Sequence, residues 1–151
     1  MTAGPEFRLA GPRDVDVLVP LVRQYRAFDG LPFSADEVRG ALDALVGDAA
    51  LGQVWLICAG ATPVGYAALC YGFSLEYGGR DAFLDELFLE APYRGQGWGR
   101  SALRCIESAL RAAGVRAVHL QVAEGNAAAL HLYLSFGFEA SPRHLLSRRI
   151  T

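Results

Sequence analysis

The chain has 151 residues, enough for one domain of ordinary size. Hydrophobic residues make up 52% of it and charged residues 20%, which excludes a disordered region, a collagen-like fibre and a disulfide-stapled miniprotein. The formal net charge is −2, so no basic excess points to nucleic acid, and all 14 basic residues are arginine. Without lysine, the chain can contain no Walker-type phosphate lysine and no Schiff-base lysine.

The first third of the sequence predicts a short strand followed by two helices. The strand covers Phe7 to Ala10. Asp14 is an N-cap candidate for a helix that runs to about Phe28, because apolar residues recur there at helical spacing. Ser34 caps a second helix, which Gly47 ends.

The uncharged stretch from Ala49 to Leu75 predicts two buried strands. It is long enough to cross ~30 Å of hydrocarbon, but Gly60-Ala61-Thr62-Pro63 interrupts it. We therefore expect strands over Val54–Ala59 and Val64–Phe73, and a fourth strand over Ala82–Glu90.

The last third predicts two helices around one strand, and then a final strand. A glycine-rich turn opens a helix over Trp98–Ala113, and a fifth strand covers Ala117–Val122. Asn126 caps a last helix that ends at Gly137, and His144–Ile150 offers a further strand.

The glycine-rich turn between Arg94 and Arg100 has the features of an anion site. The first N–H groups of the following helix have no backbone acceptors, and the helix dipole adds positive charge there. Glycines allow the close approach that a phosphate needs, although a tight bend without a ligand is the alternative. A Rossmann loop is disfavoured, because Arg100 stands where the third glycine of G-x-G-x-x-G would fall.

The three cysteines and three histidines suggest no further chemistry. Cys58, Cys70 and Cys105 lie far apart among apolar neighbours, so we expect reduced thiols and a cytoplasmic protein. The histidines have no metal-ligand spacing with one another or with the cysteines, so no metal is expected. No basic start leads into an apolar stretch between Met1 and Phe7, so no secretory signal is expected.

Three motifs together resemble the GNAT superfamily of N-acetyltransferases. Arg94-x-x-Gly97-x-Gly99 after an apolar strand resembles the family's motif A. A second family pattern is similar to the stretch from Asn126 through Ala129 and Tyr133 to Gly137-Phe138. The segment 84–89, with its two acids, resembles the acid-bearing fourth strand, and the element order agrees from about Phe7 to the end.

The resemblance implies an α/β (α+β) fold in a single domain over residues 1–151, with a core from about residue 6. The mixed, mostly antiparallel sheet would have six to seven strands and about four flanking helices, and it would splay open between strands four and five. Acetyl-CoA would lie in that gap.

The resemblance also assigns residues to acetyl-CoA. The main chain of Leu87, Phe88 and Leu89 would pair with the pantetheine arm, as an added strand does. The pyrophosphate would be held by the turn, whose residues are Arg94, Gly95, Gln96, Gly97, Trp98, Gly99 and Arg100. Asn126, Ala129 and Tyr133 would contact the cofactor from the last helix.

Acetyl transfer to an amine needs a base for the ammonium and a proton for the departing thiolate. Tyr133 matches the family's proton donor to the coenzyme A sulfur, although spacing alone would make it a core aromatic. Asp85 and Glu86 are both candidate bases. Because neighbouring strand residues point to opposite faces, we expect only one of them to face the acceptor.

The region between the first two helices is expected to select the acceptor, as it does in the family. The candidates there are Tyr25, Phe28, Asp29 and Phe33, each of which is also a common turn or packing residue. Asp29 is suited to pair with a cationic amine. Gln121 stands where acetyltransferases of ribosomal-protein N-termini have a glutamate base, which disfavours such a substrate.

The resemblance therefore implies an acetyl-CoA-dependent N-acetyltransferase that acts by direct transfer on a primary amine of a small molecule, such as an amino acid or a polyamine-like compound. A protein or peptide N-acetyltransferase and a non-catalytic acyl-CoA-binding sensor are the alternatives. No nucleic-acid or membrane partner is expected. Dimers are frequent in the family, which leaves a homodimer open.

Overall fold

The computed structural model describes residues 3–151, so Met1 and Thr2 of the predicted domain lie outside the described residues. The chain forms two compact units, a larger one that ends at Gln121 and a smaller one over Val122–Thr151. In the described residues the larger unit contains five strands and three α-helices, and the smaller unit contains one α-helix. The prediction of one domain over the whole chain stays a prediction.

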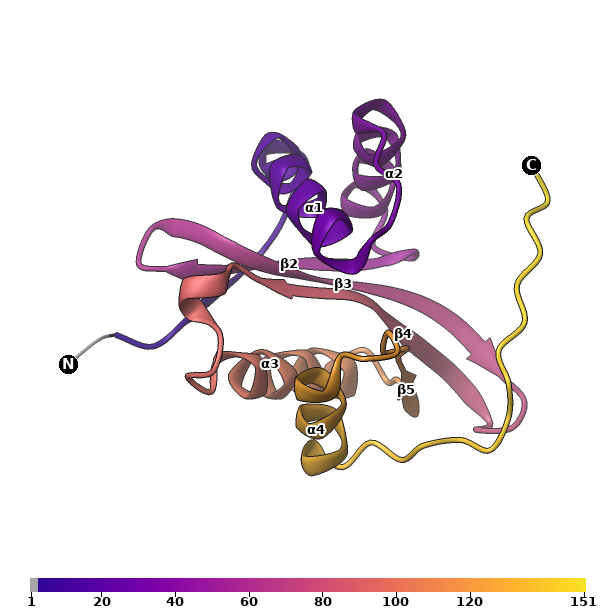
Figure 1. Cartoon of the computed structure of the whole chain (residues 1–151). Helices are drawn as coiled ribbons and strands as arrows, with labels where there is room; N and C mark the ends of the chain where they lie inside the picture. The colour runs from indigo at the N-terminus through magenta and orange to yellow at the C-terminus, as the bar shows by residue number, and fades with distance from the viewer. Residues whose placement is uncertain (1–2) are drawn as a thin grey trace. The chain divides into compact units, whose positions relative to one another are not determined.

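The larger unit is built on a mixed five-stranded sheet in which sheet order equals chain order (Figure 1). The strands are β1 (Glu6–Leu9), β2 (Gly52–Ala59), β3 (Thr62–Ser74), β4 (Gly79–Leu89) and β5 (Ala117–His119). The first four pair antiparallel, and β5 runs parallel to β4.

The predicted six to seven strands are wrong, because the described residues form five. The segment His144–Ile150 contains no strand, and its apolar residues Leu146 and Ile150 are 90% and 86% exposed. A strand is stable only when a neighbour pairs its backbone and covers its apolar side chains, and no described strand pairs with this segment. The fifth strand also stops at His119, three residues before its predicted end at Val122.

Helices cover both faces of this sheet (Figure 1). α1 (Val15–Asp29) and α2 (Ala35–Gly47) pack on one face against a cluster that includes Leu56, Tyr66 and Phe88. α3 (Trp98–Ala112) places Trp98 and Ala102 against Ile57 and Val64 on the other face. Burial on both faces explains why β2 and β3 lack charge almost throughout.

The ends of the helices follow their capping residues. Ser34 Oγ accepts a hydrogen bond from the Glu37 N–H at 3.4 Å, which confirms the predicted cap of α2. Gly30 ends α1 in the left-handed conformation. Asp14 is the N-cap residue of α1, as predicted, but its side chain makes no capping bond to that helix. Its Oδ2 instead accepts from the N–H of Gly11, the N-cap of the short 3-10 turn Pro12–Asp14, at 2.8 Å.

The smaller unit contains α4 (Ala127–Phe136) and the segment that follows it. Asn126 Oδ1 accepts from the Ala129 N–H at 3.2 Å, and Gly137 ends the helix at a φ of 119°. Both ends of α4 lie where the sequence predicts them. Within residues 3–151, no helix has the length and apolar character needed to cross a membrane.

A β-bulge in β4 changes which residues face α1. Ala68 and Leu69 are consecutive in β3, yet they pair with Glu86 and Leu84. Asp85 is therefore the extra residue on β4. As a result Leu84 and Glu86 point to opposite faces, although a regular strand would place them on the same one.

The pairing between β4 and β5 is short. It covers Asp81, Ala82 and Phe83 of β4, and a contact of 3.0 Å between Asp81 Oδ2 and His119 Nε2 reinforces it. Beyond Phe83, no described strand pairs with the outer edge of β4. On that edge the backbone groups of residues 84–88 therefore have no partner strand among the described residues, while the Leu89 carbonyl accepts a hydrogen bond from Arg94 Nε at 2.7 Å.

We predict that Gly65→Ala lowers the free energy of unfolding by about 1–3 kcal/mol, since a Cβ there would lie 2.2 Å from the Phe88 carbonyl oxygen and would push β3 from β4. Gly40→Ala is the matched control, because Gly40 lies inside α2 with nothing within 4 Å of a new Cβ. That substitution should stabilise the protein by about 0.5–1 kcal/mol. Urea unfolding measures both. Parental stability of Gly65→Ala would contradict the close approach of the two strands.

Candidate active site

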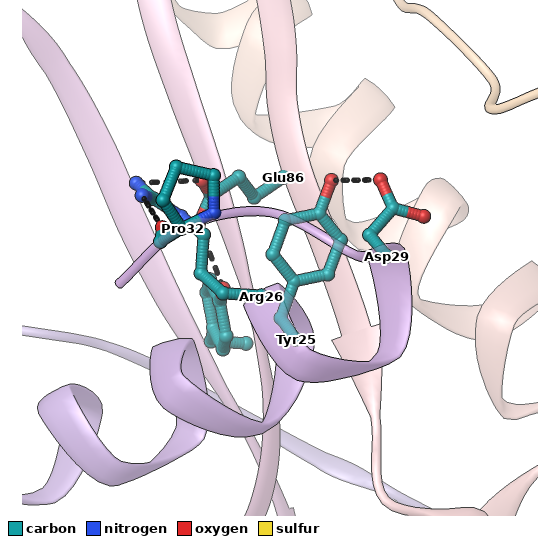
Figure 2. A network of polar contacts seen from close by, with 6 residues as sticks. Tyr25, Arg26, Asp29, Pro32 and Glu86 are labelled. Carbon is teal, nitrogen blue, oxygen red and sulfur yellow. Dashed lines mark hydrogen bonds and ion pairs between the residues drawn. The ribbon is translucent and has the colours of Figure 1, made fainter.

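Glu86 is a partly buried carboxylate on the face of the sheet that α1 covers. The Tyr66 hydroxyl, from the neighbouring strand, donates a hydrogen bond of 2.7 Å to Oε1. Arg26 Nη2, from the last turn of α1, lies 3.8 Å from Oε2 (Figure 2). The side chain is only 16% exposed. The Glu86 carboxylate is therefore largely shielded from bulk water and contacts the Tyr66 hydroxyl and the Arg26 guanidinium.

The pKa of Glu86 is raised above its ordinary value of 4.5. Burial is the largest cause, because it disfavours the charged form. The nearby carboxylates Asp85 and Asp29 add to the rise, while the Tyr66 hydrogen bond and the Arg26 charge oppose it. A carboxyl group with a raised pKa is better able to accept a proton near neutral pH.

Asp85 has a different environment. It is exposed, it is the extra residue of the bulge, and no hydrogen bond joins it to another described side chain. Of the two adjacent acids, the structure thus places Glu86 in the polar network against α1 and leaves Asp85 at the surface.

The end of α1 brings Tyr25 and Asp29 toward Glu86. The Tyr25 hydroxyl donates to Asp29 Oδ2 at 3.3 Å (Figure 2), and the Tyr25 ring meets the rings of Tyr66 and Phe88 edge-on. Burial and the charges of Asp29 and Glu86 raise the pKa of Tyr25, which therefore stays a neutral phenol. Two of the four predicted acceptor residues thus join the candidate base.

The other two predicted acceptor residues lie against arginines. Phe28 is 55% exposed, and the Arg94 guanidinium stacks 4.4 Å from its ring centre. Phe33 packs on the edge of the core beneath Arg23, whose guanidinium is 4.9 Å from its ring centre. Gln121 lies two residues beyond β5 and is exposed.

The glycine-rich turn has the backbone shape of an anion cradle. Gly95 and Gly97 have φ angles of 72° and 84°, a region that other residues rarely adopt. A Cβ at either position would meet no atom within 4 Å, so the space beside the turn is open. No described side chain caps α3, whose first N–H groups lack intrahelical acceptors. These features fit a bound phosphate group.

Two polar side chains of the turn bind the backbone of the segment that precedes it. Arg94 Nε donates to the Leu89 carbonyl at 2.7 Å, and Gln96 Nε2 donates to the Pro92 carbonyl at 2.7 Å. Trp98 is buried beside Tyr93, and Arg100 is partly buried in the first turn of α3. The turn is thus braced by its side chains while its glycine backbone stays accessible.

The predicted cofactor strand is the end of β4 beyond its pairing with β5. Phe88 is buried on the α1 side, and Leu87 and Leu89 pack on the α3 side. Their side chains therefore pack in the two cores, and on their outer edge the Leu89 carbonyl already accepts a hydrogen bond from Arg94 Nε.

The predicted residues of the smaller unit are ordered within it. Asn126 and Ala129 form the cap of α4. Tyr133 is buried, and its ring meets Phe138 edge-on. Burial raises the pKa of Tyr133 to about 12, which keeps its hydroxyl protonated at neutral pH.

The prediction missed Tyr66 and Arg26, the two partners of Glu86. Tyr66 lies in an uncharged stretch that predicts only a core strand, so no signal marks its hydroxyl. Arg26 had a signal, because it is four residues from Val22, on the apolar stripe of α1. A cation on a buried stripe indicates a buried partner. In residues 3–151, no cluster of three or more His, Cys, Asp or Glu side chains is arranged to hold a metal ion.

A family model for the acetyltransferase (GNAT) family matches residues 22–138. The chain belongs to the GNAT family of acetyltransferases. It is similar to the uncharacterized N-acetyltransferase YycN of Bacillus subtilis, with 36% identity over 64 residues. That match covers 42% of this chain and spans only 41% of the relative's length.

Solved structures share the fold of this GNAT chain. An integron cassette protein from the mobile metagenome of Cole Harbour Salt Marsh is 36% identical, with a TM-score of 0.86 over 96% of this chain and 90% of that one. A predicted acetyltransferase with acetyl-CoA from Clostridium acetobutylicum is 15% identical, with a TM-score of 0.81 over 95% and 96% of the two chains. The second likeness shows the fold alone.

We predict that Glu86→Gln becomes more stable relative to the parent as the pH rises. A carboxyl group whose pKa is raised on folding stabilises the protein below its ordinary pKa, and this contribution is lost as the pH rises through the folded-state value. The glutamine side chain does not titrate, so the free energy of unfolding of Glu86→Gln lacks this pH-dependent decrease. Urea unfolding from about pH 4 to about pH 8 measures the difference. The same substitution at Glu107, in an exposed pair with Arg111 on α3, is the control. A pH-independent difference at position 86 would contradict the raised pKa.

Proposed function

We propose that this GNAT enzyme transfers the acetyl group of acetyl-CoA directly to a primary amine of a small, cationic molecule. The observation that carries the proposal is the partly buried Glu86, held beside Tyr25 and Asp29 by Tyr66 and Arg26. The candidate base on β4 thus lies beside an acidic acceptor surface at the end of α1, and β4 itself leads into the glycine-rich turn.

Support for acetyl-CoA as the cofactor comes from the turn and from the edge of β4. The open backbone at Gly95 and Gly97 and the N-terminus of α3 suit the pyrophosphate. The edge of residues 87–89 has no partner strand, and its backbone groups other than the Leu89 carbonyl suit the amide groups of the pantetheine arm. When bound, acetyl-CoA supplies the thioester carbonyl that the amine attacks. Asn126 and Ala129 are proposed to contact it because they match the family motif.

Glu86 is proposed as the general base. Its Oε1 accepts the Tyr66 hydrogen bond, whereas no described group donates a hydrogen bond to Oε2. Oε2 can therefore take the proton of the incoming ammonium. The neutral amine then forms a C–N bond to the acetyl carbon as the C–S bond breaks, and the acetylated nitrogen releases its second proton to solvent, which can resupply the acid. The departing thiolate needs a proton. Tyr133 is proposed to give that proton, since it matches the family motif and stays protonated at neutral pH.

The acceptor is proposed to be cationic because carboxylates outnumber cations around Glu86. The charges of Asp85 and Asp29 both raise the pKa of Glu86, whereas the charge of Arg26 lowers it. An ammonium group would restore the balance. Tyr25 and Asp29, with Phe28 and Phe33 nearby along the chain, are proposed to contact the acceptor. The free thiols of Cys58, Cys70 and Cys105 suit a cytoplasmic enzyme.

The first test is calorimetric titration with acetyl-CoA beside NADH, followed by turnover with a panel of small amines. We expect saturable binding of acetyl-CoA alone and turnover with cationic primary amines. Glu86→Gln is the control, because it should bind acetyl-CoA like the parent and lose turnover. Absence of acetyl-CoA binding would contradict the cofactor assignment. Binding without turnover of any amine would favour a sensor, and turnover of peptides alone would favour a protein acetyltransferase.

The roles of the two acids are separated by pH–rate profiles. We expect Glu86→Gln to lower kcat/KM by about 10²–10⁴-fold and to lose the acidic limb, because the general base is gone. Asp85→Asn should keep that limb, since Asp85 is exposed at the bulge. Profiles of kcat/KM against pH with the same amine measure both. Retention of the acidic limb in Glu86→Gln would remove Glu86 as the base.

A further inference from the structure

We propose that Arg26 is a positioning residue of the active site, whose single guanidinium ties the connection between α1 and α2 to Glu86. The proposal rests on the proposed function of Glu86, and it assigns a role to a residue outside the family motifs quoted above. Arg26 touches no reacting atom in this role. It acts through the carboxylate and through the segment 30–34.

The geometry of Arg26 places its two terminal nitrogens on different partners. Nη1 donates to the Pro32 carbonyl at 2.9 Å, while Nη2 lies 3.8 Å from Glu86 Oε2 (Figure 2). Pro32 belongs to the connection that carries Phe33, a proposed acceptor residue. One planar group therefore spans the acceptor segment and the base.

The burial of Arg26 argues that this arrangement is specific. The side chain is 30% exposed, and its Nε is buried without a hydrogen-bond partner. Leaving a buried donor unpaired has a cost, so the group is held there by its other contacts. Lysine could supply the charge but not the fork, because an ammonium group is a point charge on a flexible stem.

The charges around Glu86 come from every element packed against it. β4 itself contributes Asp85, α1 contributes Tyr25, Arg26 and Asp29, and β3 contributes Tyr66 and Cys70. Arg26 is the one cation in this set. Its removal takes away the charge that lies 3.8 Å from Glu86 Oε2 and lowers the pKa of Glu86.

The experiment compares Arg26→Gln, which removes both charge and fork, with Arg26→Lys, which keeps the charge. Arg39→Gln is the matched control, because Arg39 forms an exposed pair with Asp16 at 2.7 Å on the outer side of the helices. Each protein is titrated by carbon-detected NMR of glutamate carboxyl groups, with Glu86 assigned from Glu86→Gln. The pH profile of kcat/KM, the KM for the amine and the Kd for acetyl-CoA are then measured.

In Arg26→Gln we expect the Glu86 titration and the acidic limb of kcat/KM to move up together by about half to one pH unit. We also expect the amine KM to rise about tenfold, because the segment 30–34 loses a charge-assisted hydrogen bond. Arg26→Lys should keep the acidic limb near the parental position and still raise the amine KM. The Kd for acetyl-CoA should stay parental in both variants.

An unmoved Glu86 titration in Arg26→Gln overturns the proposal. So does a general loss of kcat with an unshifted acidic limb, since that is the behaviour of a residue needed only for folding. If Arg26→Gln does not fold, the amine KM of Arg26→Lys is the test. A raised KM supports the link between the segment 30–34 and Glu86, and a parental KM overturns it. If the parent turns over no amine, the proposed function is wrong, and the NMR titration alone decides whether Arg26 holds Glu86.

Discussion

The site depends on keeping one carboxylate, Glu86, both partly buried and able to ionise. Burial favours the neutral form of this group and raises its pKa, because the charged form loses its water. The Tyr66 hydrogen bond, from the adjacent strand β3, and the Arg26 guanidinium, from α1, both stabilise the charged form and so oppose the effect of burial. The packing of α1 on the sheet is therefore what brings the counter-charge into reach, and the core and the site are stabilised by the same contact surface.

The end of β4 contacts the core on each face of the sheet and also forms an edge of the sheet, and several neighbouring side chains bind to it. Alternate side chains enter the cores on its two faces, and its outer edge is left open beyond Phe83. The second half of α1 is joined to this end of the strand at three places. Gln24 Nε2 donates to Glu90 Oε2 at 2.9 Å, Arg26 lies beside Glu86, and Arg94 stacks between Phe28 and Phe88. The proposed cofactor and the proposed amine would thus both bind next to the contact between α1 and the end of β4.

Sequence reasoning predicts the helices and the first four strands well, because capping residues and apolar periodicity are local signals. It fails at His144–Ile150, since pairing depends on a partner strand that no local pattern reveals. The acids were found from a motif, but their faces could not be assigned, because alternation assumes an unbroken ladder and the bulge at Asp85 breaks it. The role of Tyr66 could not be predicted from local sequence, because its hydroxyl binds Glu86, which lies twenty positions further along the chain.

The bulge also has a consequence for how such chains can be compared and altered. Because Asp85 is the surplus residue, a chain lacking it would pair Leu84 and Glu86 as ordinary neighbours and would still direct the glutamate toward α1. Two adjacent acids in this strand are then not interchangeable copies. Asp85 occupies the bulge, a position that a shorter strand would lack, whereas Glu86 holds a position in the regular pairing with β3. Deletion of Asp85 would therefore remove the bulge and leave the direction of Glu86 unchanged.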